Sequence, residues 1–183
     1  MIITVICLRT AQCVHPFNTR SSIIVLVFSL VCLSTPCLSQ STDEQKVKDV
    51  IAQLFKGMEL GDSAMVHRCF MPEVTMATVK INKEGGAVLS REGDLTGFLK
   101  AIGTPRPEKL YEEIWDVEVA IDGMFAQVWC DYAFYLGNKF SHCGVDAFQL
   151  FKDGAKWRIF HLADTRKTVG CNIPADIANK HAQ

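Results

Sequence analysis

Residues 111–165 read YEEIWDVEVAIDGMFAQVWCDYAFYLGNKFSHCGVDAFQLFKDGAKWRIFHLADT, and this stretch decides the fold. It contains four apolar runs: Tyr111–Ile121, Phe125–Leu136, Phe140–Phe151 and Lys156–Thr165. Successive runs are separated by dipeptides that tolerate the positive φ angles of tight hairpin turns, namely Asp122-Gly123, Gly137-Asn138 and Asp153-Gly154. The stretch therefore predicts an antiparallel meander of four strands.

Helical patterns come before the meander. Thr42 and Gln45 can form a capping box, and apolar side chains between residues 47 and 58 then recur at helical spacing until Gly61. A second short helix is predicted to continue through Phe70 and to end at Pro72. The remaining elements of this half are predicted to be strands over residues 75–81 and 87–90 and a helix over residues 94–102. Helices and a hairpin followed by a long meander describe an α+β domain.

Composition and charge narrow the classes of function. The chain has 183 residues, of which 49% are hydrophobic, so it can build one sizeable core. Its formal net charge is −1, and no basic tract interleaves with aromatic residues, so nucleic-acid binding has no electrostatic support. The sequence contains neither a glycine-rich phosphate loop nor a Gly-x-Ser-x-Gly elbow. No cofactor is predicted.

The N-terminus has the features of a secretory signal. The apolar run Ser21–Leu33 follows Arg20 and is too short for a comfortable membrane span. Cleavage after Ser39 would export the mature protein to the periplasm or outside the cell, with no stable membrane span. The alternative is an uncleaved anchor. The predicted organisation is a signal peptide over 1–39, a domain over 40–171 and a C-terminal tail over 172–183.

Four cysteines follow the leader, at positions 69, 130, 143 and 171. Their spacing fits no zinc pattern. Export would permit disulfides, and Cys143 with Cys171 is a conceivable pair, although connectivity cannot be deduced from sequence. The alternative is that these residues are buried free thiols, which behave as small hydrophobes.

Two paired motifs of the meander carry a family resemblance. They are FSHCGVDAFQLF, residues 140–151, and WRIFHLADTR, residues 157–166, and VWCDYAFY over residues 128–135 fits the same pattern. The chain resembles the nuclear transport factor 2-like superfamily, with its SnoaL-like, ketosteroid isomerase-like and lumazine-binding branches. This resemblance implies a curved antiparallel sheet that forms a cone-like half barrel on N-terminal helices, as in the cystatin-like arrangement. It also implies a pocket on the concave face and a homodimer through the convex face.

Strand alternation then selects candidate catalytic residues. Phe140, His142, Asp146 and Phe148 share one face of their strand, which we assign to the concave side. Burial would raise the pKa of Asp146 and suit it to proton transfer, as the resemblance to ketosteroid isomerase-like sites also implies. His142 could relay a proton, and Tyr132 on the neighbouring strand could hold an oxyanion. The structural alternative is that Asp146 bonds to Arg166, Tyr132 or backbone amides.

Other residues are candidates for ligand binding. Phe134 and Phe148 are predicted on the pocket wall, and Trp115 in the wall or the core. Asp164 and Arg166 share a face of the last strand, where a purely structural ion pair is the alternative. On the second strand of the meander, Trp129, Asp131 and Tyr135 are placed opposite the pocket, in a candidate dimer interface. No metal site is predicted, because Cys143 points away from His142 and Asp146.

Three functions remain open at this level. The first is an exported protein that binds a small apolar or aromatic molecule in its pocket. The second is a cofactor-independent isomerase or dehydratase with Asp146 as the general base. The third is a dimerisation or interaction module without a ligand. Convergent carboxylate, imidazole and phenol groups around a pocket would favour the enzyme, whereas a cavity filled by side chains would favour the interaction module.

Overall fold

The computed structural model describes residues 42–92 and 94–182. The predicted signal peptide, residues 1–39, lies outside them. Within the described residues, no helix is both long enough and apolar enough to span a bilayer. The helices are α1 (Asp43–Leu60), α2 (Ser63–His67), α3 (Thr96–Gly103) and α4 (Ala175–Lys180). The strands are β1 (Phe70–Ile81), β2 (Ala87–Glu92), β3 (Leu110–Asp122), β4 (Phe125–Leu136), β5 (Lys139–Asp153) and β6 (Lys156–Arg166).

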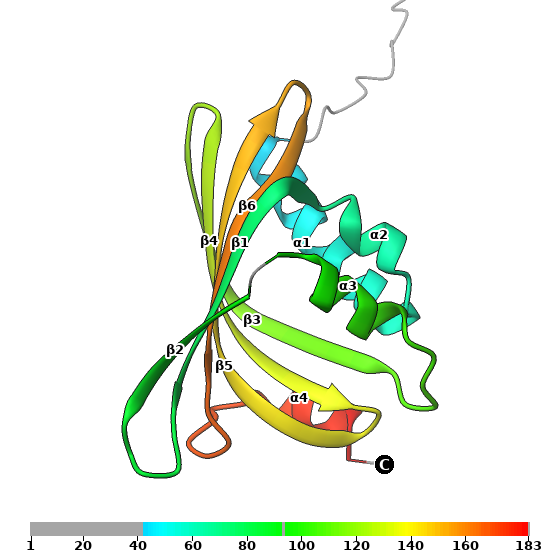
Figure 1. The fold of residues 1–183 in the computed structure, drawn as a ribbon, viewed down its shortest axis with the longest axis vertical. Helices are drawn as coiled ribbons and strands as arrows, with labels where there is room; N and C mark the ends of the chain where they lie inside the picture. Colours follow the sequence, from blue (N-terminus) through cyan, green and yellow to red (C-terminus); the bar gives the residue numbers. More distant parts are fainter. Residues whose placement is uncertain (1–41, 93, 183) are drawn as a thin grey trace, which may run out of the picture. The chain divides into compact units, whose positions relative to one another are not determined.

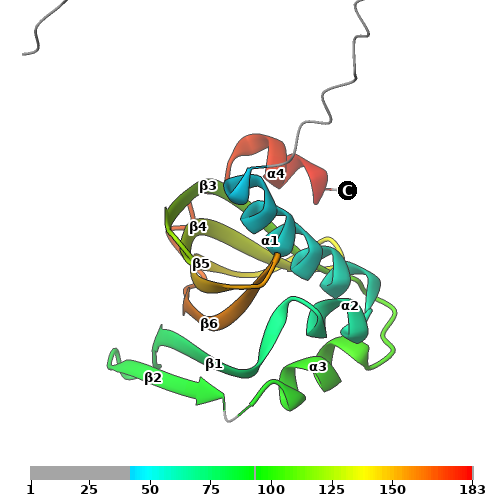
Figure 2. The same cartoon turned by 90° about the horizontal axis from the view of Figure 1, so that it is seen from above.

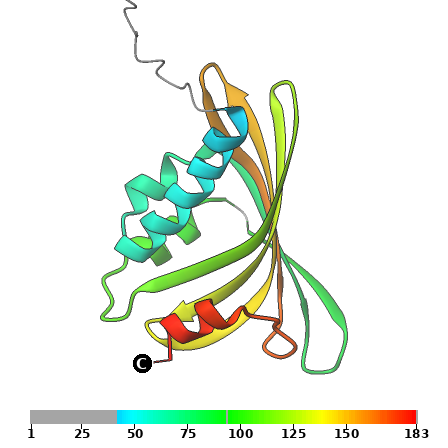
Figure 3. The same ribbon diagram turned by 180° about the vertical axis from the view of Figure 1, so that it is seen from behind.

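One curved sheet of six strands carries the fold, in the order β2-β1-β6-β5-β4-β3. Strands β3 to β6 form the predicted antiparallel meander, which is confirmed. Helices α1, α2 and α3 lie on the concave side of the sheet (Figures 1 and 2). Helix α4 lies on the opposite side (Figure 3). The α+β architecture expected from the sequence is therefore confirmed, and the sheet stays open rather than closing into a barrel.

Strand β1 pairs with β6 in parallel, so the sheet is mixed. Three tight turns of the meander have glycines with positive φ, at Gly123, Gly137 and Gly154, as the turn dipeptides predicted. Nothing local in the sequence specifies the β1–β6 pair, because its residues are about 90 positions apart along the chain. This pairing places β1 beside the last strand, where it closes one flank of the concave face.

Helix α1 begins and ends where its capping residues predict. The Thr42 hydroxyl accepts a hydrogen bond from the Gln45 amide at 3.2 Å, and Gly61 ends the helix in the left-handed conformation with φ of 67°. Its apolar stripe packs on the sheet through Val47, Ile51 and Leu54, which are buried. The helix thus forms the roof over the concave face.

The second helix is shorter than predicted. Helix α2 ends at His67, and β1 already begins at Phe70, so Pro72 lies in a strand and does not end the helix. The pairing of β1 with β6 is irregular between Phe70 and Thr75. Proline is tolerated there because its missing N–H is not needed by a regular ladder.

The convex face of the sheet carries a second, smaller core. Ile177 of α4 packs there with Ala133 and Tyr135, and a disulfide joins Cys143 to Cys171. Tyr135 is therefore covered by its own chain and is not available to the dimer interface expected from the sequence, whereas Trp129 is 49% exposed. The other two cysteines, at positions 69 and 130, are buried free thiols.

Candidate functional site

A cavity of about 550 Å³ lies between the concave face of the sheet and helices α1 and α3. Most of its wall is apolar, with contributions from Leu54, Phe55, Met58, Phe98, Phe134 and Phe148. A volume of this size is typical of sites for small molecules. The cavity is not filled by side chains, so a ligand has room to bind.

Polar side chains from five strands of the sheet, β1, β3, β4, β5 and β6, line this cavity. The predicted residues Tyr132, His142, Asp146, Asp164 and Arg166 all line it. They are joined by residues that sequence reasoning did not select, of which Glu112 on β3 and Thr78 on β1 matter most. The structure thus brings together every predicted site residue except Trp115.

Asp146 is almost completely buried, with 3% of its surface exposed. It hydrogen-bonds to Glu112, and neither Arg166 nor Tyr132 is its partner. Within the described part of the chain, the second carboxyl oxygen of Asp146, Oδ2, has no hydrogen-bond partner. A buried oxygen of this kind is costly unless a ligand or water meets it.

The two carboxyl groups hold a proton between them. Burial, followed by the negative charge of Glu112, raises the pKa of Asp146 well above its ordinary value. Burial also raises the pKa of Glu112 to about 7, although its hydrogen bond with Asp146 acts in the opposite direction. Two carboxylates cannot hydrogen-bond to each other without a proton, so near neutral pH the pair carries one, mainly on Asp146.

Asp164 is the centre of a separate polar group on the same wall. Its Oδ2 accepts a hydrogen bond from Nε of Arg166 at 2.6 Å, and its Oδ1 accepts one from the Thr78 hydroxyl at 2.5 Å. Burial alone would lower the pKa of Arg166, but the bond to Asp164 and its charge outweigh burial and raise it. The ion pair that the sequence allowed is therefore present, and it lines the cavity as well.

Tyr132 has only one proton to donate, and two acceptors face it. Its hydroxyl lies 2.9 Å from the carbonyl oxygen of Thr165 and 3.1 Å from Oδ2 of Asp164. Burial raises its pKa, so the phenol keeps its proton. In this geometry Tyr132 positions the end of β6 and Asp164, and holding an oxyanion would require it to exchange one of these partners.

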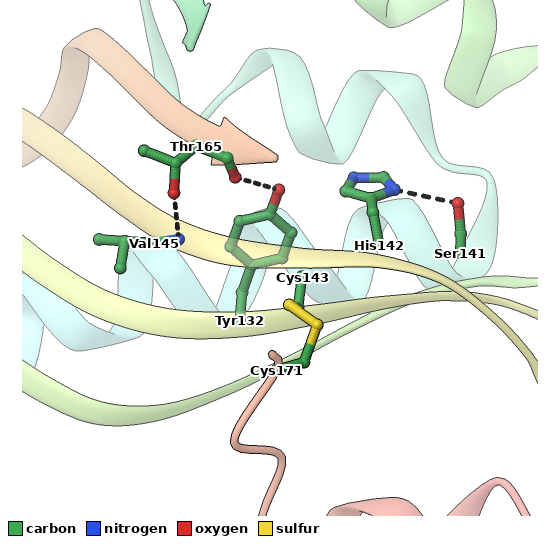
Figure 4. The surroundings of a disulfide bond; sticks show 7 residues. All are labelled: Tyr132, Ser141, His142, Cys143, Val145, Thr165 and Cys171. Atoms are coloured by element: carbon green, nitrogen blue, oxygen red, sulfur yellow. Dashed lines mark hydrogen bonds between the residues drawn. A yellow bond between two sulfur atoms is a disulfide. The ribbon is translucent and has the colours of Figure 1, made fainter. Parts of the chain in front are cut away.

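His142 projects from β5 to the same side as Tyr132, while the disulfide of Cys143 projects to the other (Figure 4). Its Nδ1 lies 3.0 Å from the Ser141 hydroxyl, and its ring lies 5.1 Å from that of Phe134, centroid to centroid. Burial lowers the pKa of His142. The imidazole is therefore neutral at neutral pH and offers the cavity a hydrogen-bonding nitrogen.

Solved structures with the same architecture identify the fold. An NTF2-like protein of unknown function from Shewanella baltica superposes with a TM-score of 0.53 at 17% identity, over 70% of this chain and 99% of its own. An NTF2-like protein with a cystatin-like fold from Novosphingobium aromaticivorans gives 0.55 at 14%, over 77% and 89%. A candidate scytalone dehydratase from the same organism gives 0.55 at 7%, over 69% and 85%. This chain has the nuclear transport factor 2-like fold.

The predicted superfamily resemblance is thus confirmed at the level of the fold. No protein-family model matches the sequence, and no curated protein matches it either. The finer resemblance to a lumazine-binding branch stays a prediction. Within the nuclear transport factor 2-like fold, the cavity described above occupies the concave side of the sheet, where the resemblance implied a pocket.

Trp115 lies on the convex face of this fold and does not line the cavity. Simple alternation would place Trp115 with Val117 and Val119, but the pairing of β3 with β4 shifts after Trp115. Asp116 adopts a φ of 49° there, and one extra residue reverses the faces. Val117 and Val119 therefore pack in the main core, and Trp115 joins the convex cluster.

A second irregularity changes the placement of Phe140. The register of β4 and β5 shifts at Ser141, because Phe134 pairs with His142 while the adjacent Tyr135 pairs with Phe140. Phe140 consequently packs against Tyr135 on the convex face, 5.7 Å between ring centroids, and the prediction that it faces the pocket is wrong. Ser141 lines the cavity in its place.

The position of Glu112 in its strand could have marked it as a site residue. It lies two residues before Ile114 in an otherwise half-apolar strand, so the two share a face. Ile114 packs against the main core, which makes a carboxyl group at residue 112 costly without a partner.

No group of three or more His, Cys, Asp or Glu side chains in the described ranges is arranged to hold a metal ion.

Proposed function

We propose that this protein is a cofactor-independent acid–base enzyme, an isomerase or dehydratase, acting on a small and largely apolar molecule. The observation that carries the proposal is the Glu112–Asp146 pair, which shares one proton at the wall of an apolar cavity and leaves Oδ2 of Asp146 without a partner in the described residues. A carboxyl group with a raised pKa is suited to proton transfer near neutral pH.

Glu112 and Asp146 can together accept one proton and donate another, so the number of protons bound to the pair is the same before and after the reaction. Glu112, as the ionised member, removes a proton from a carbon next to a carbonyl or carbon–oxygen bond of the substrate. In an isomerisation it returns that proton to another carbon. In a dehydration the carbon–oxygen bond breaks and Asp146 gives its proton to the leaving hydroxyl, which departs as water. In both cases the pair ends with one proton, and a transfer between its two members restores the starting state.

The neighbouring side chains support the assignment of Glu112 as the base and Asp146 as the acid. Asp164 accepts hydrogen bonds from Arg166 and Thr78, so both of its carboxyl oxygens already have partners within the protein. Neutral His142 can donate to or accept from a substrate oxygen, depending on its tautomer. The apolar wall excludes water, which strengthens each of these polar contacts with the substrate.

A protein that binds a small molecule without changing it is the second candidate. The apolar wall favours it, since most of the cavity offers shape and hydrophobic contact rather than chemistry. The interaction module is the weakest of the three, because a vestigial pocket would not be expected to retain a buried carboxyl group, Asp146, beside an unfilled cavity.

Deuterium exchange separates the enzyme from the binding protein. The purified protein is incubated in D₂O with β-benzoylpropionate and its naphthoyl and biphenyl analogues, which are enolisable ketones of increasing size. NMR follows both binding and loss of the proton next to the carbonyl. We expect catalysed exchange that falls about a hundredfold or more in Asp146→Asn and Glu112→Gln, since general acid–base groups contribute on this scale.

The control is Glu118→Gln, because Glu118 is an exposed glutamate of the same strand as Glu112. It should exchange at the rate of the wild type. Ketones that bind but show no exchange above buffer would overturn the enzyme proposal in favour of the binding protein, and so would exchange that survives in both carboxyl variants.

A further inference from the structure

A second cation lines the cavity at a place the acid–base chemistry does not use. Arg106 belongs to the loop between α3 and β3, and it is exposed, whereas Asp146 is nearly fully buried. Arg106 therefore stands at the rim of the cavity, and the Glu112–Asp146 pair in its interior. Phe98 and Ile102 of α3 and Leu110 of β3, all apolar, also line the cavity.

Arg106 is held in place by backbone carbonyl groups. Its Nη2 donates to the carbonyl oxygen of Ala101, and its Nε lies 3.5 Å from that of Thr104. Both carbonyls belong to the C-terminal end of α3, where the helix leaves acceptors without partners. These contacts orient the guanidinium group but do not neutralise its charge.

No acidic side chain in residues 42–92 or 94–182 lies within ion-pair distance of Arg106. Arg166, the other arginine of the cavity, is instead paired with Asp164 at 2.6 Å. The two bonds to carbonyls leave Nη1 of Arg106 and one hydrogen of Nη2 free, from the five N–H groups of a guanidinium. A planar edge of this kind suits a carboxylate, which it can bind through two hydrogen bonds.

We propose that the substrate is an amphiphilic carboxylic acid: Arg106 binds its carboxylate at the rim, and its apolar body extends inward so that its carbonyl or hydroxyl end reaches Glu112 and Asp146. The reactive end of this description rests on the proposed function, whereas the carboxylate at Arg106 does not. Arg106 is then a residue that determines specificity and takes no part in the proton transfer.

Matched pairs of ligands test the inference. β-Benzoylpropionate and its naphthoyl and biphenyl analogues are each compared with the corresponding primary amide, which keeps the shape and removes the charge. Calorimetry gives the affinities of the wild type, of Arg106→Gln and of Arg91→Gln, an exposed arginine of β2 outside the cavity. We expect the wild type and Arg91→Gln to bind the acid at least about tenfold more tightly than the amide, as a charge-assisted hydrogen bond predicts.

In Arg106→Gln this preference should disappear while the affinity for the amide stays unchanged. Equal binding of acid and amide by the wild type, a preference that persists in Arg106→Gln, or no binding by any pair would each overturn the inference. The exchange experiment is read separately. If the acid binds more tightly than the amide but no exchange is catalysed, the enzyme proposal fails and the carboxylate site at Arg106 stands. If exchange is catalysed but acid and amide bind equally, the enzyme proposal stands and the carboxylate site fails.

Discussion

Gly144 shows how one residue fixes the polar wall of the cavity. A Cβ atom built at Gly144 would lie 1.8 Å from the carbonyl oxygen of Thr165, a backbone atom that cannot rotate away. The same carbonyl accepts the hydrogen bond of Tyr132 at 2.9 Å, and the Thr165 hydroxyl accepts one from the Val145 amide at 3.0 Å. The close approach that only glycine allows therefore holds the end of β6 over β5 (Figure 4).

We predict that Gly144→Ala lowers the free energy of unfolding by about 2 to 3 kcal/mol, the usual cost of forcing an extra carbon into a packed site. It should also separate Thr165 from Tyr132 and weaken ligand binding. Urea denaturation measures the first effect and ligand titration the second. The matched control for the stability measurement is Gly97→Ala in α3, where a Cβ atom meets nothing within 4 Å. Its stability should equal or slightly exceed that of the wild type, and equal stability of both variants would contradict the prediction.

The sequence predicted only some of the side chains of the site. Asp146 stood out because a carboxyl group among apolar residues of a strand needs a partner, and the structure supplies Glu112. The partner itself was missed, since it lies on β3 and reaches Asp146 across β4. A contact between strands that are not neighbours depends on the curvature of the sheet, which no local pattern records.

Among the elements, two bulges account for the misplaced aromatic residues. Alternation along a strand assigns faces correctly until one extra residue is inserted, and every later residue then changes face. Asp116 and Ser141 mark these insertions, and neither is a glycine or a proline that would have indicated an irregularity. The strands were therefore predicted well, whereas the faces of Trp115 and Phe140 were not.

Helix α4 depends on two kinds of contact with the convex face. The imidazole of His181, which follows the helix, stacks on Tyr135 with 3.9 Å between ring centroids, and Lys180 bonds to Glu113 at 3.0 Å. The disulfide from Cys143 to Cys171 closes a loop of 28 residues just before the helix. Such a bond persists only in an oxidising compartment, which the expected export would provide.

We predict that Cys171→Ser lowers the free energy of unfolding by about 3 to 4 kcal/mol, as the loss of a crosslink of this span implies. Because α4 contacts the face opposite the cavity, ligand binding at the cavity should change little. Urea denaturation of the variant is compared with that of the wild type before and after reduction. Reduced wild type should match the variant, and a variant as stable as the oxidised wild type would show that α4 is held by packing alone.

For the whole molecule, the sequence predicted the order of elements better than their long-range pairing. Turn dipeptides and alternation gave the meander, and capping residues gave α1, because each of these rests on residues that are near neighbours in the chain. The parallel pairing of β1 with β6 and the docking of α4 join residues far apart. They follow from burying the remaining apolar surface of the molecule, which only the complete fold determines.

The carboxyl pair should also make the stability of the whole molecule depend on pH. The pKa of Glu112 has its ordinary value of about 4.5 in the unfolded chain, and burial raises it to about 7 in the folded protein. Between these values the folded state binds more protons than the unfolded state. The free energy of unfolding therefore falls as pH rises through this window: the stabilising contribution is complete below about pH 4.5 and lost above about pH 7. The full loss is about 3 to 4 kcal/mol, since a pKa difference of one unit corresponds to about 1.4 kcal/mol.

Glu112→Gln removes this titration, so its unfolding free energy, measured in urea from pH 4.5 to pH 8, should change by about 3 kcal/mol less than that of the wild type. Glu118→Gln, on the exposed face of the same strand, should keep the slope of the wild type. The comparison is made between slopes because other groups titrate in both proteins and cancel in the difference. A wild type and a Glu112→Gln variant with the same slope would contradict the raised pKa of Glu112 in the folded protein, and the proton transfer near neutral pH that is proposed for it would then lose its physical basis.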